Sequence, residues 1–219
     1  MTQVATTQAS DNSSESSAGS GAVSAATADK PPRPRDRILT AAADLFYRHG
    51  IRAVGVEAIA EAAGTNKMTL YRHFASKDAL VAEYLRQLGQ EADAAWDEAA
   101  KAYIGNPKGE IRAWLEQVAS CVTSGGEGGC ALANAAVELR DKDHPARAVI
   151  EEFKTRHRNR LVRLFRDAGL AQPERLADEI FLLVEGARIN IQSVGADGPG
   201  SRLVSMLQNL IDDHARRGS

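Results

Sequence analysis

The stretch EAIAEAAGTNKMTLYRHF, at residues 57–74, constrains the fold more than any other part of the chain. Its first half is an apolar stripe at helical spacing that stops before Gly64, and either Thr65 or Asn66 can cap a second short helix. Two helices joined by a turn of about three or four residues that contains glycine are typical of a helix-turn-helix. The stretch therefore predicts this motif.

The segments on either side also have helical patterns. Upstream, apolar residues predict a helix at 35–49 that stops at Gly50, and downstream Ser76 can cap a helix of about 28 residues, roughly 40 Å long. The composition agrees, because Ala, Leu, Glu and Arg dominate and β-branched runs are few. We therefore expect an all-α protein, with further helices at 109–124, 130–140, 145–168, 173–195 and 200–216.

Residues 1–34 differ from the rest of the chain. They are rich in Ser, Ala and Thr, have no hydrophobic period, and run into the sequence KPPRPR. Such a composition predicts a disordered tail. The basic run from Lys30 to Arg37 either reaches into a DNA groove or belongs to a variable extension, and both interpretations stay open.

Basic residues are concentrated in one segment. The net charge of the whole chain is -2, yet residues 33–90 contain nine Lys and Arg against six Asp and Glu. The two cysteines, Cys121 and Cys130, lack the CxxC spacing of a zinc site, and we expect them to be reduced thiols. These features predict no metal site and a location in the reducing cytoplasm.

Several classes of protein are excluded by missing patterns. The longest apolar run, IFLLV at residues 180–184, is far shorter than the roughly 18 residues that a membrane helix needs. The N-terminal residues lack the basic and apolar regions of a secretory signal. The chain also contains no GxSxG, P-loop, Rossmann or HExxH motif, so we expect neither an enzyme nor a cofactor.

The second short helix of the motif has two distinct faces. Leu70 and Phe74 are four residues apart and can dock on the protein, whereas Lys67, Thr69, Tyr71 and His73 lie off that line. Thr69 is small enough to meet a thymine methyl group, and Lys67 can reach guanine acceptors or a phosphate. This face is therefore suited to the major groove of DNA.

Lys77 lies in the first turn of the next predicted helix, directly after its Ser76 cap. A cation at that position is unfavourable for the helix dipole. A phosphate there would be attracted both by the exposed amides and by Lys77. The arrangement therefore predicts a contact with the DNA backbone.

Residues 36–85 resemble the DNA-binding domain of the TetR (tetracycline-repressor-like) family of transcriptional regulators. The matching sequence is RILTAAADLFYRHGIRAVGVEAIAEAAG followed by NKMTLYRHFASKDAL. The resemblance implies a repressor-like dimer, with a helix-turn-helix DNA-binding domain at 35–82 and a helical effector-binding and dimerisation domain at 83–219. The residues expected to contact DNA are Thr65, Asn66, Lys67, Thr69, Tyr71, Arg72, His73 and Lys77.

The chain departs from the family pattern in two places. Val54-Gly55 stands where a Thr or Ser commonly precedes the second helix, so a hydroxyl that caps the helix and contacts phosphate is missing. Thr65-Asn66 replaces a more usual Val-Ser pair before the recognition helix, which changes the groups offered to the bases.

The last two predicted helices carry wide apolar stripes, through Leu176, Ile180 and Leu183 in one and Leu203, Leu207 and Leu210 in the other. Two such helices from each of two protomers can form a four-helix dimer bundle. The alternative, in which both stripes serve only the core of one protomer, stays open.

Polar and aromatic residues on the C-terminal helices indicate a mixed, moderately polar pocket. Simpler explanations stay open for them, such as an ion pair between Glu185 and Arg188 or a solvent-exposed Glu138. His157 lies in the basic stretch KTRHRNRLVR, which fits an ordinary amphipathic helix better than a second nucleic-acid surface. The candidate effector-pocket residues are Trp114, Asn134, Glu138, Phe153, His157, Phe181 and Glu185.

These observations predict a sequence-specific regulator of transcription. We expect a homodimeric repressor that a small-molecule effector releases from a palindromic double-stranded operator, with the long helix after Ser76 as the lever between the two parts. No membrane partner is expected. A DNA-binding protein without an effector and an activator of transcription stay open as alternatives.

Overall fold

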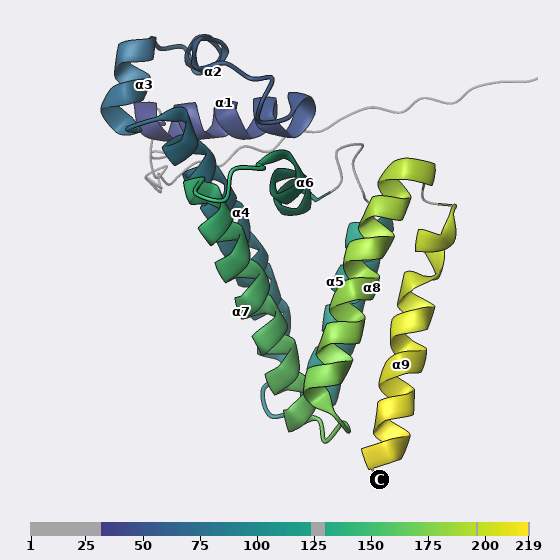
Figure 1. The fold of residues 1–219 in the computed structure, drawn as a ribbon. Helices are drawn as coiled ribbons and strands as arrows, with labels where there is room; N and C mark the ends of the chain where they lie inside the picture. Colours follow the sequence, from purple (N-terminus) through teal and green to yellow (C-terminus); the bar gives the residue numbers. More distant parts are fainter. Residues whose placement is uncertain (1–31, 124–129, 196, 219) are drawn as a thin grey trace, which may run out of the picture. The chain divides into compact units, whose positions relative to one another are not determined.

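The computed structural model describes residues 32–123, 130–195 and 197–218, and this part of the chain folds into helices without any strand (Figure 1). The predicted all-α class is therefore confirmed. Of the predicted tail at residues 1–34, residues 1–31 lie outside the described part of the chain. The α-helices are α1 (Pro34–His49), α2 (Val56–Ala62), α3 (Lys67–His73), α4 (Lys77–Ala100), α5 (Pro107–Thr123), α6 (Ala131–Glu138), α7 (Pro145–Asp167), α8 (Pro173–Val194) and α9 (Leu203–Gly218), with 3-10 turns η1 (Lys101–Tyr103) and η2 (Pro199–Arg202).

The ends of the helices follow local chemistry. The Asn66 side chain accepts a hydrogen bond from Thr69 N at 2.9 Å, and Ser76 Oγ accepts one from Ala79 N at 3.0 Å, so both predicted caps are present. Helices α1, α5, α7 and α8 all begin at a proline, which fits the first turn because its missing N–H needs no partner there. This places the start of α5 at Pro107, two residues before the predicted start.

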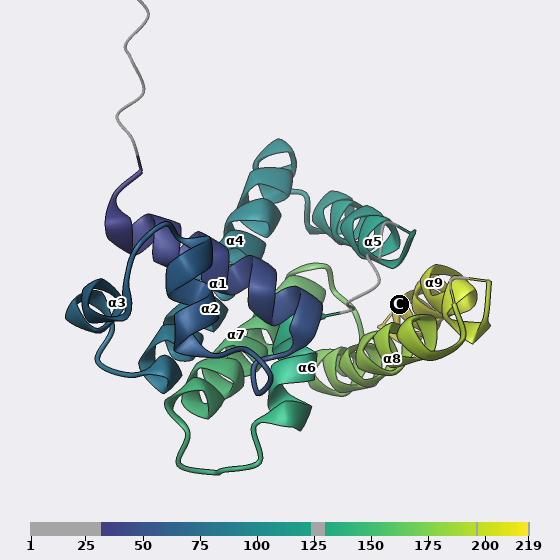
Figure 2. The same ribbon diagram turned by 90° about the horizontal axis from the view of Figure 1, so that it is seen from above.

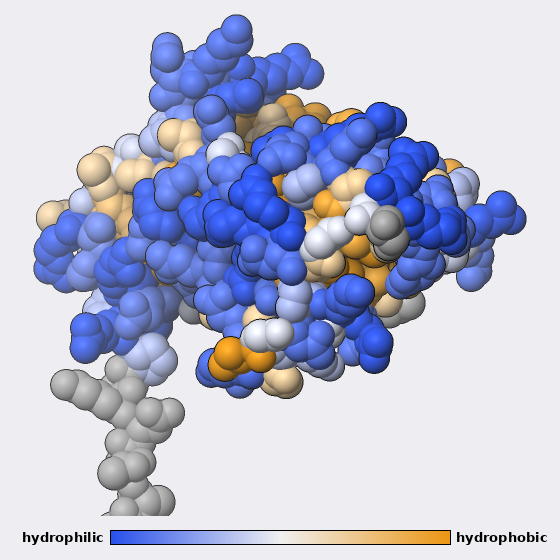
Figure 3. All heavy atoms as spheres, turned by 90° about the horizontal axis from the view of Figure 1, so that it is seen from below, coloured by the Kyte–Doolittle hydropathy of each residue, from blue (hydrophilic) through white to orange (hydrophobic). Residues whose placement is uncertain are grey.

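Helices α4 and α7 lie at the centre of the fold, and the other helices are arranged around them. Helices α1, α2 and α3 gather around the first part of α4, and α7 runs beside α4 in both views (Figures 1 and 2). Helix α8 packs on α7, and α9 packs on α8 and α5. Seen from below, most of the surface is hydrophilic and is interrupted by hydrophobic patches (Figure 3).

The buried side chains form two separate clusters. The first joins α1, α2, α3 and the first half of α4 to α6 and the start of α7, with Ile38, Leu70 and Leu85 fully enclosed. The second joins the end of α4 to α5, α8, α9 and the second half of α7, around Trp96 and Phe165. Burying one such side chain contributes about 1.5–3 kcal/mol. Because α4 and α7 supply residues to both clusters, a displacement of either helix affects both.

The sequence also predicted reduced cysteines and no membrane-spanning helix. Cys130 is a half-buried free thiol, whereas the side chain of Cys121 lies outside the described part of the chain. Within the described ranges, none of the helices is long and apolar enough to cross a membrane.

Candidate nucleic-acid interface and effector cavity

Helix α3 is docked through the two apolar residues that its spacing predicts. Leu70 is fully buried and Phe74 is 5% exposed, which confirms them as core positions. The guanidinium of Arg35 in α1 lies 5.3 Å from the centre of the Phe74 ring and also donates to Glu83 in α4 at 2.5 Å. These contacts fix the end of α3 between α1 and α4.

The opposite side of α3 is open to solvent. Tyr71 is 42% exposed, and the side chains of Arg72 and His73 at the end of the helix are exposed as well. Because the helix is held by its other face, these groups are free to meet a surface without disturbing the core. Among the predicted DNA-binding residues, Asn66, Lys67, Tyr71, Arg72 and His73 are exposed, and Thr65, Thr69 and Lys77 are half-buried.

Lys67 has a partner that sequence reasoning missed. Its Nζ donates to Glu57 Oε1 of α2 at 2.6 Å, and this hydrogen bond lowers the pKa of Glu57 and raises the pKa of Lys67. Both side chains are exposed to solvent, so the ion pair is weak. The two residues are ten positions apart across a turn, a spacing that carries no helical pairing signal.

Met68 lies on the exposed side of α3 and is not among the residues that the sequence predicted to contact DNA. Its side chain is 85% exposed on α3, which is high for an apolar residue in a folded protein. Apolar side chains contact thymine methyl groups in the major groove. Its position off the Leu70–Phe74 line was the available signal.

The first turn of α4 lies directly after α3. Ser76 caps this turn, and the half-buried Lys77 follows it. Asp78 in the same turn lies 3.3 Å from Nε2 of His144, whose Nδ1 in turn accepts from Ala146 N at 3.1 Å. The start of α4 is thereby tied to the start of α7. At α2, Gly55 is the N-cap and provides no side-chain hydrogen bond, as its sequence predicts.

A cavity of about 110 Å³ lies among α4, α5, α7 and α8. Five of the seven predicted pocket residues line it, and the other two, Asn134 and Glu138, do not. Both belong to α6, which packs with α1 and α4 in the first buried cluster instead of the second. The lining residues are Ala92, Trp114, Gln117, Val118, Phe153, Lys154, His157, Leu161, Ile180, Phe181, Val184, Glu185 and Arg188.

Glu138 has a different place from the one predicted. Its carboxylate accepts hydrogen bonds from the backbone amides of Ile51 at 3.0 Å and Arg52 at 2.5 Å, in the turn that follows α1. Gly50 has a φ of 78°, and a Cβ there would lie 3.3 Å from Oε1 of Glu138. The positive φ and the approach of the carboxylate both favour glycine at that position. Glu138 therefore fastens α6 to the turn that follows α1.

The cavity contains a small group of charged side chains. Lys154 donates to Glu185 at 2.5 Å, and Arg188 lies 3.6 Å from the same carboxylate, which confirms the predicted pair of Glu185 and Arg188. A nitrogen-to-sulfur contact of 3.4 Å joins Arg188 to Cys130, which directly precedes α6. Helix α8 is thereby linked to the segment that carries Glu138.

His157 is enclosed by aromatic rings. Its ring centre lies 4.7 Å from that of Trp96 and 5.6 Å from that of Phe153. Burial, reinforced by the positive charge of Arg188, lowers the pKa of His157 to about 4. The imidazole is therefore neutral at physiological pH and can offer one donor and one acceptor.

The basic stretch around His157 is neutralised by carboxylates. Arg156 pairs with Asp93 at 2.9 Å, and Arg158 pairs with Asp178 at 2.5 Å. Arg160 pairs with Asp97 at 2.6 Å. These pairs leave no concentrated positive patch on this stretch, which supports the ordinary amphipathic helix over a second nucleic-acid surface.

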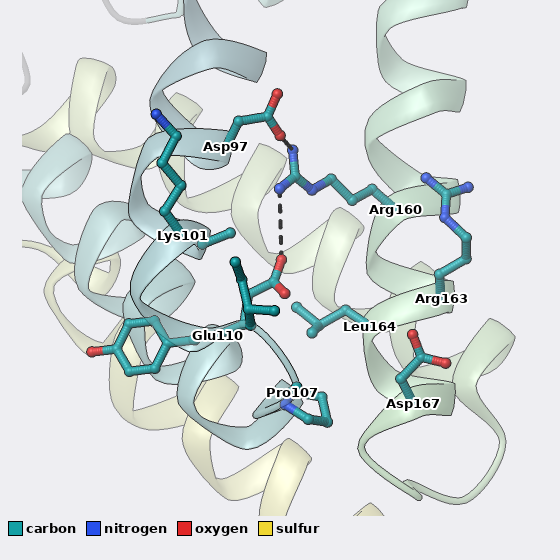
Figure 4. A pocket seen from close by; sticks show the side chains of 12 residues that line it. Asp97, Lys101, Pro107, Glu110, Arg160, Arg163, Leu164 and Asp167 are labelled. Carbon is teal, nitrogen blue, oxygen red and sulfur yellow. Dashed lines mark hydrogen bonds and ion pairs between the residues drawn. The ribbon is translucent and has the colours of Figure 1, made fainter.

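A second, more open cavity of about 490 Å³ lies where α4, α5 and α7 meet. Figure 4 shows Asp97 and Glu110 facing Arg160 from two sides, and Arg160 lies 3.6 Å from Glu110. Arg163 and Asp167 of α7 also line this cavity. Its charges are of both signs and largely paired, so the cavity shows no preference for a charged ligand.

The fold and the exposed polar helix define a helix-turn-helix DNA-binding protein. Residues 38–84 match the model of the bacterial regulatory proteins of the tetR family. A TetR transcriptional regulator from Streptomyces avermitilis is 32% identical, with a TM-score of 0.70, over 84% of this chain and 99% of its own. The chain belongs to the TetR family.

Other relatives agree with this assignment. A TetR-family transcriptional regulator from Streptomyces coelicolor has a TM-score of 0.77 and 25% identity over 83% of this chain and 96% of its own. The HTH-type transcriptional repressor KstR2 of Mycolicibacterium smegmatis is 42% identical over 60 residues, which are 27% of this chain and 29% of that protein. The curated relatives are thus matched over less than a third of their length. Regulators of this family are DNA-binding transcription factors and not enzymes.

Proposed function

We propose that the protein binds a palindromic operator as a homodimer and represses transcription until a small molecule releases it. The observation that carries this proposal is α3, a short helix that is docked through the buried Leu70 and carries mostly polar, exposed side chains on its outer side. The relative KstR2 is a transcriptional repressor, which supports repression over activation. We place the action in the cytoplasm, where bacterial operators are found.

The DNA-binding domain comprises residues 35–82 in this proposal. The exposed side of α3 enters the major groove, where Lys67, Tyr71 and His73 meet base edges together with Thr69. Lys77 binds a phosphate at the start of α4, assisted by the exposed amides of that turn. The remaining proposed DNA contacts lie near the two ends of α3 and are Thr65, Asn66 and Arg72.

The effector-binding and dimerisation domain comprises residues 83–219. Apolar side chains of α8 and α9 remain exposed in the single chain, among them Leu182 at 72%, Ile189 at 47% and Met206 at 45%. Leu182 and Ile189 are seven residues apart and therefore share one side of α8. Covering this side with the same helices of a second copy gives the four-helix arrangement that the sequence predicts.

The effector acts through the two helices that both buried clusters share. The 110 Å³ cavity is lined by α4 and α7, and the same helices support α1, α2 and α3 at their other ends. A ligand that prefers one arrangement of α4 and α7 shifts the separation of the two recognition helices in the dimer. Coupling of about 1–3 kcal/mol is sufficient for such control.

The test is a selection from random double-stranded DNA by the full-length protein at physiological salt, followed by sequencing of the bound pool. We expect an inverted repeat whose half-sites lie about one helical turn apart. Binding without a motif that disappears as salt rises would contradict the proposal.

A further inference from the structure

The 110 Å³ cavity is charged at one end and apolar at the other. The contact of 2.5 Å between Lys154 of α7 and Glu185 of α8 fixes the alignment of these two helices. Arg188 lies near this contact, whereas Leu161 and Ile180 lie one to two turns away along their helices in the opposite direction. A ligand must therefore combine a polar group with an apolar body.

The charged end has an excess of positive charge. Lys154 and Arg188 are opposed by one carboxylate, that of Glu185, among the residues that line the cavity. His157 adds no charge because it is neutral at physiological pH. The cavity as a whole therefore favours an anion with a single charge.

Arg188 is the cation with unused hydrogen-bonding capacity. A guanidinium has five N–H donors, and among the described residues Arg188 makes only a contact of 3.6 Å to Glu185 and one of 3.4 Å to the sulfur of Cys130, a weak acceptor. Lys154, in contrast, is engaged by Glu185 at 2.5 Å. A carboxylate is the anion that matches the planar fork of a guanidinium with two parallel hydrogen bonds.

The apolar end sets the size of the ligand. Trp114 provides an aromatic wall and Ile180 and Leu161 provide aliphatic ones, while Phe181 borders both ends, with its ring centre 5.7 Å from Nζ of Lys154. An apolar protein cavity of about 150 Å³ holds one benzene molecule. The volume of about 110 Å³ is smaller than this, which limits the apolar body to at most one ring or a compact branched chain.

We propose that the effector is a small monocarboxylate with one aromatic ring or a similarly compact apolar body. Arg188 binds its carboxylate, and Trp114, Phe181 and Ile180 enclose its apolar part. This inference rests on the proposed role of the cavity as the effector site. It also gives a route for release, because the guanidinium that binds the carboxylate contacts Cys130, and a shift of Arg188 on binding is therefore passed to α6, which Cys130 directly precedes.

The experiment is calorimetric titration of the full-length protein with four probes: benzoate, phenylacetate, benzamide and benzylamine. The carboxylates should bind about tenfold or more tightly than the neutral amide, and the cationic amine should not bind. Arg188→Met should remove the preference for the carboxylates, and Arg188→Lys should restore part of it. The matched control is Arg163→Met, which removes a guanidinium of α7 that lines the other cavity and should leave benzoate binding unchanged.

Three outcomes would overturn the proposed ligand class. They are equal binding of benzamide and benzoate, unchanged benzoate binding by Arg188→Met, and no binding of either carboxylate at millimolar concentration. If a neutral compound releases the protein from its selected operator instead, the ligand class is wrong and the proposed function stands. If the carboxylates bind as expected but no operator is selected, the ligand class stands and the proposed function fails.

Discussion

At the scale of single residues, the proposed contact with DNA is made by side chains on the exposed side of α3. In the free protein, Glu57 holds Lys67 at 2.6 Å, so a carboxylate lies beside the lysine that we assign to the groove. A phosphate and this carboxylate repel each other. In the proposed complex this ion pair therefore opposes DNA binding, and both of its members are exposed to solvent.

Glu57→Gln should strengthen operator binding several-fold, because it removes a negative charge and frees Lys67. Lys67→Ala should weaken binding and lower the slope of log affinity against log salt by about one. Fluorescence anisotropy on the selected operator measures both effects. Glu61→Gln, which removes an exposed carboxylate from the same helix, is the control. An equal gain from both glutamate variants would show that only net charge matters.

His157 gives the protein a specific dependence of stability on pH. Its pKa is about 4 in the folded chain against an ordinary value of 6.5, so the unfolded chain binds more protons between these values. The free energy of unfolding should therefore fall by up to about 3 kcal/mol as the pH decreases through this window, relative to His157→Gln. Urea unfolding at a series of pH values measures the difference. His49→Gln removes an exposed histidine and should follow the wild-type curve.

At the scale of helices, α6 connects the turn that follows α1 with α8. Its C-terminal Glu138 holds the amides of Ile51 and Arg52, and Cys130 directly before it contacts Arg188 of α8. The helix has only eight residues and is too short to be stable alone. Its position therefore depends on these contacts at both ends and on the buried cluster beneath it.

Glu138→Ala should lower the free energy of unfolding by about 1–3 kcal/mol, because two backbone amides lose their acceptor. Glu138→Gln retains one acceptor oxygen and should lose less. Glu151→Ala, which removes an exposed carboxylate from α7, is the control for the loss of charge. Urea denaturation measures all three, and equal stabilities of Glu138→Ala and Glu151→Ala would contradict the role of Glu138.

Local patterns predicted the parts of the fold that depend on a few neighbouring residues. The cap at Ser76 and the buried pair Leu70 and Phe74 were predicted, and Asn66 was one of two candidates for the other cap, because each depends on a spacing of three or four residues. The place of Glu138 was not, since its partners lie more than 80 residues away. A polar residue on an apolar helix indicates an unusual environment but does not specify which neighbouring helix it faces.

The same limit explains which candidate pocket residues the structure brings together. Trp114, His157 and Phe181 lie on α5, α7 and α8, which surround the cavity together with α4. Asn134 has an equally suggestive sequence context but belongs to α6, which packs in the first cluster. Only the tertiary arrangement distinguishes the two cases.

At the scale of the whole molecule, the proposed dimer depends on the exposed side of α8. Leu182→Glu combined with Ile189→Glu should give a monomer, because two charges would be buried in an apolar interface. Analytical ultracentrifugation measures the state of association. Ile104→Glu changes another residue that is 89% exposed, outside this side of α8, and should leave the association unchanged. A double variant that still sediments as a dimer would place the interface elsewhere.

The central claim is that the exposed side of α3 reads the sequence of DNA, and two tyrosines allow a matched test. Tyr71 on α3 and Tyr47 on α1 are both 42% exposed. Random double-stranded DNA should be selected in parallel by the wild-type protein, Tyr71→Ala and Tyr47→Ala, and the bound pools sequenced. We predict an inverted repeat that Tyr47→Ala retains and that Tyr71→Ala relaxes at the same position in both half-sites. An identical motif from all three proteins would contradict the assignment of Tyr71 to base recognition.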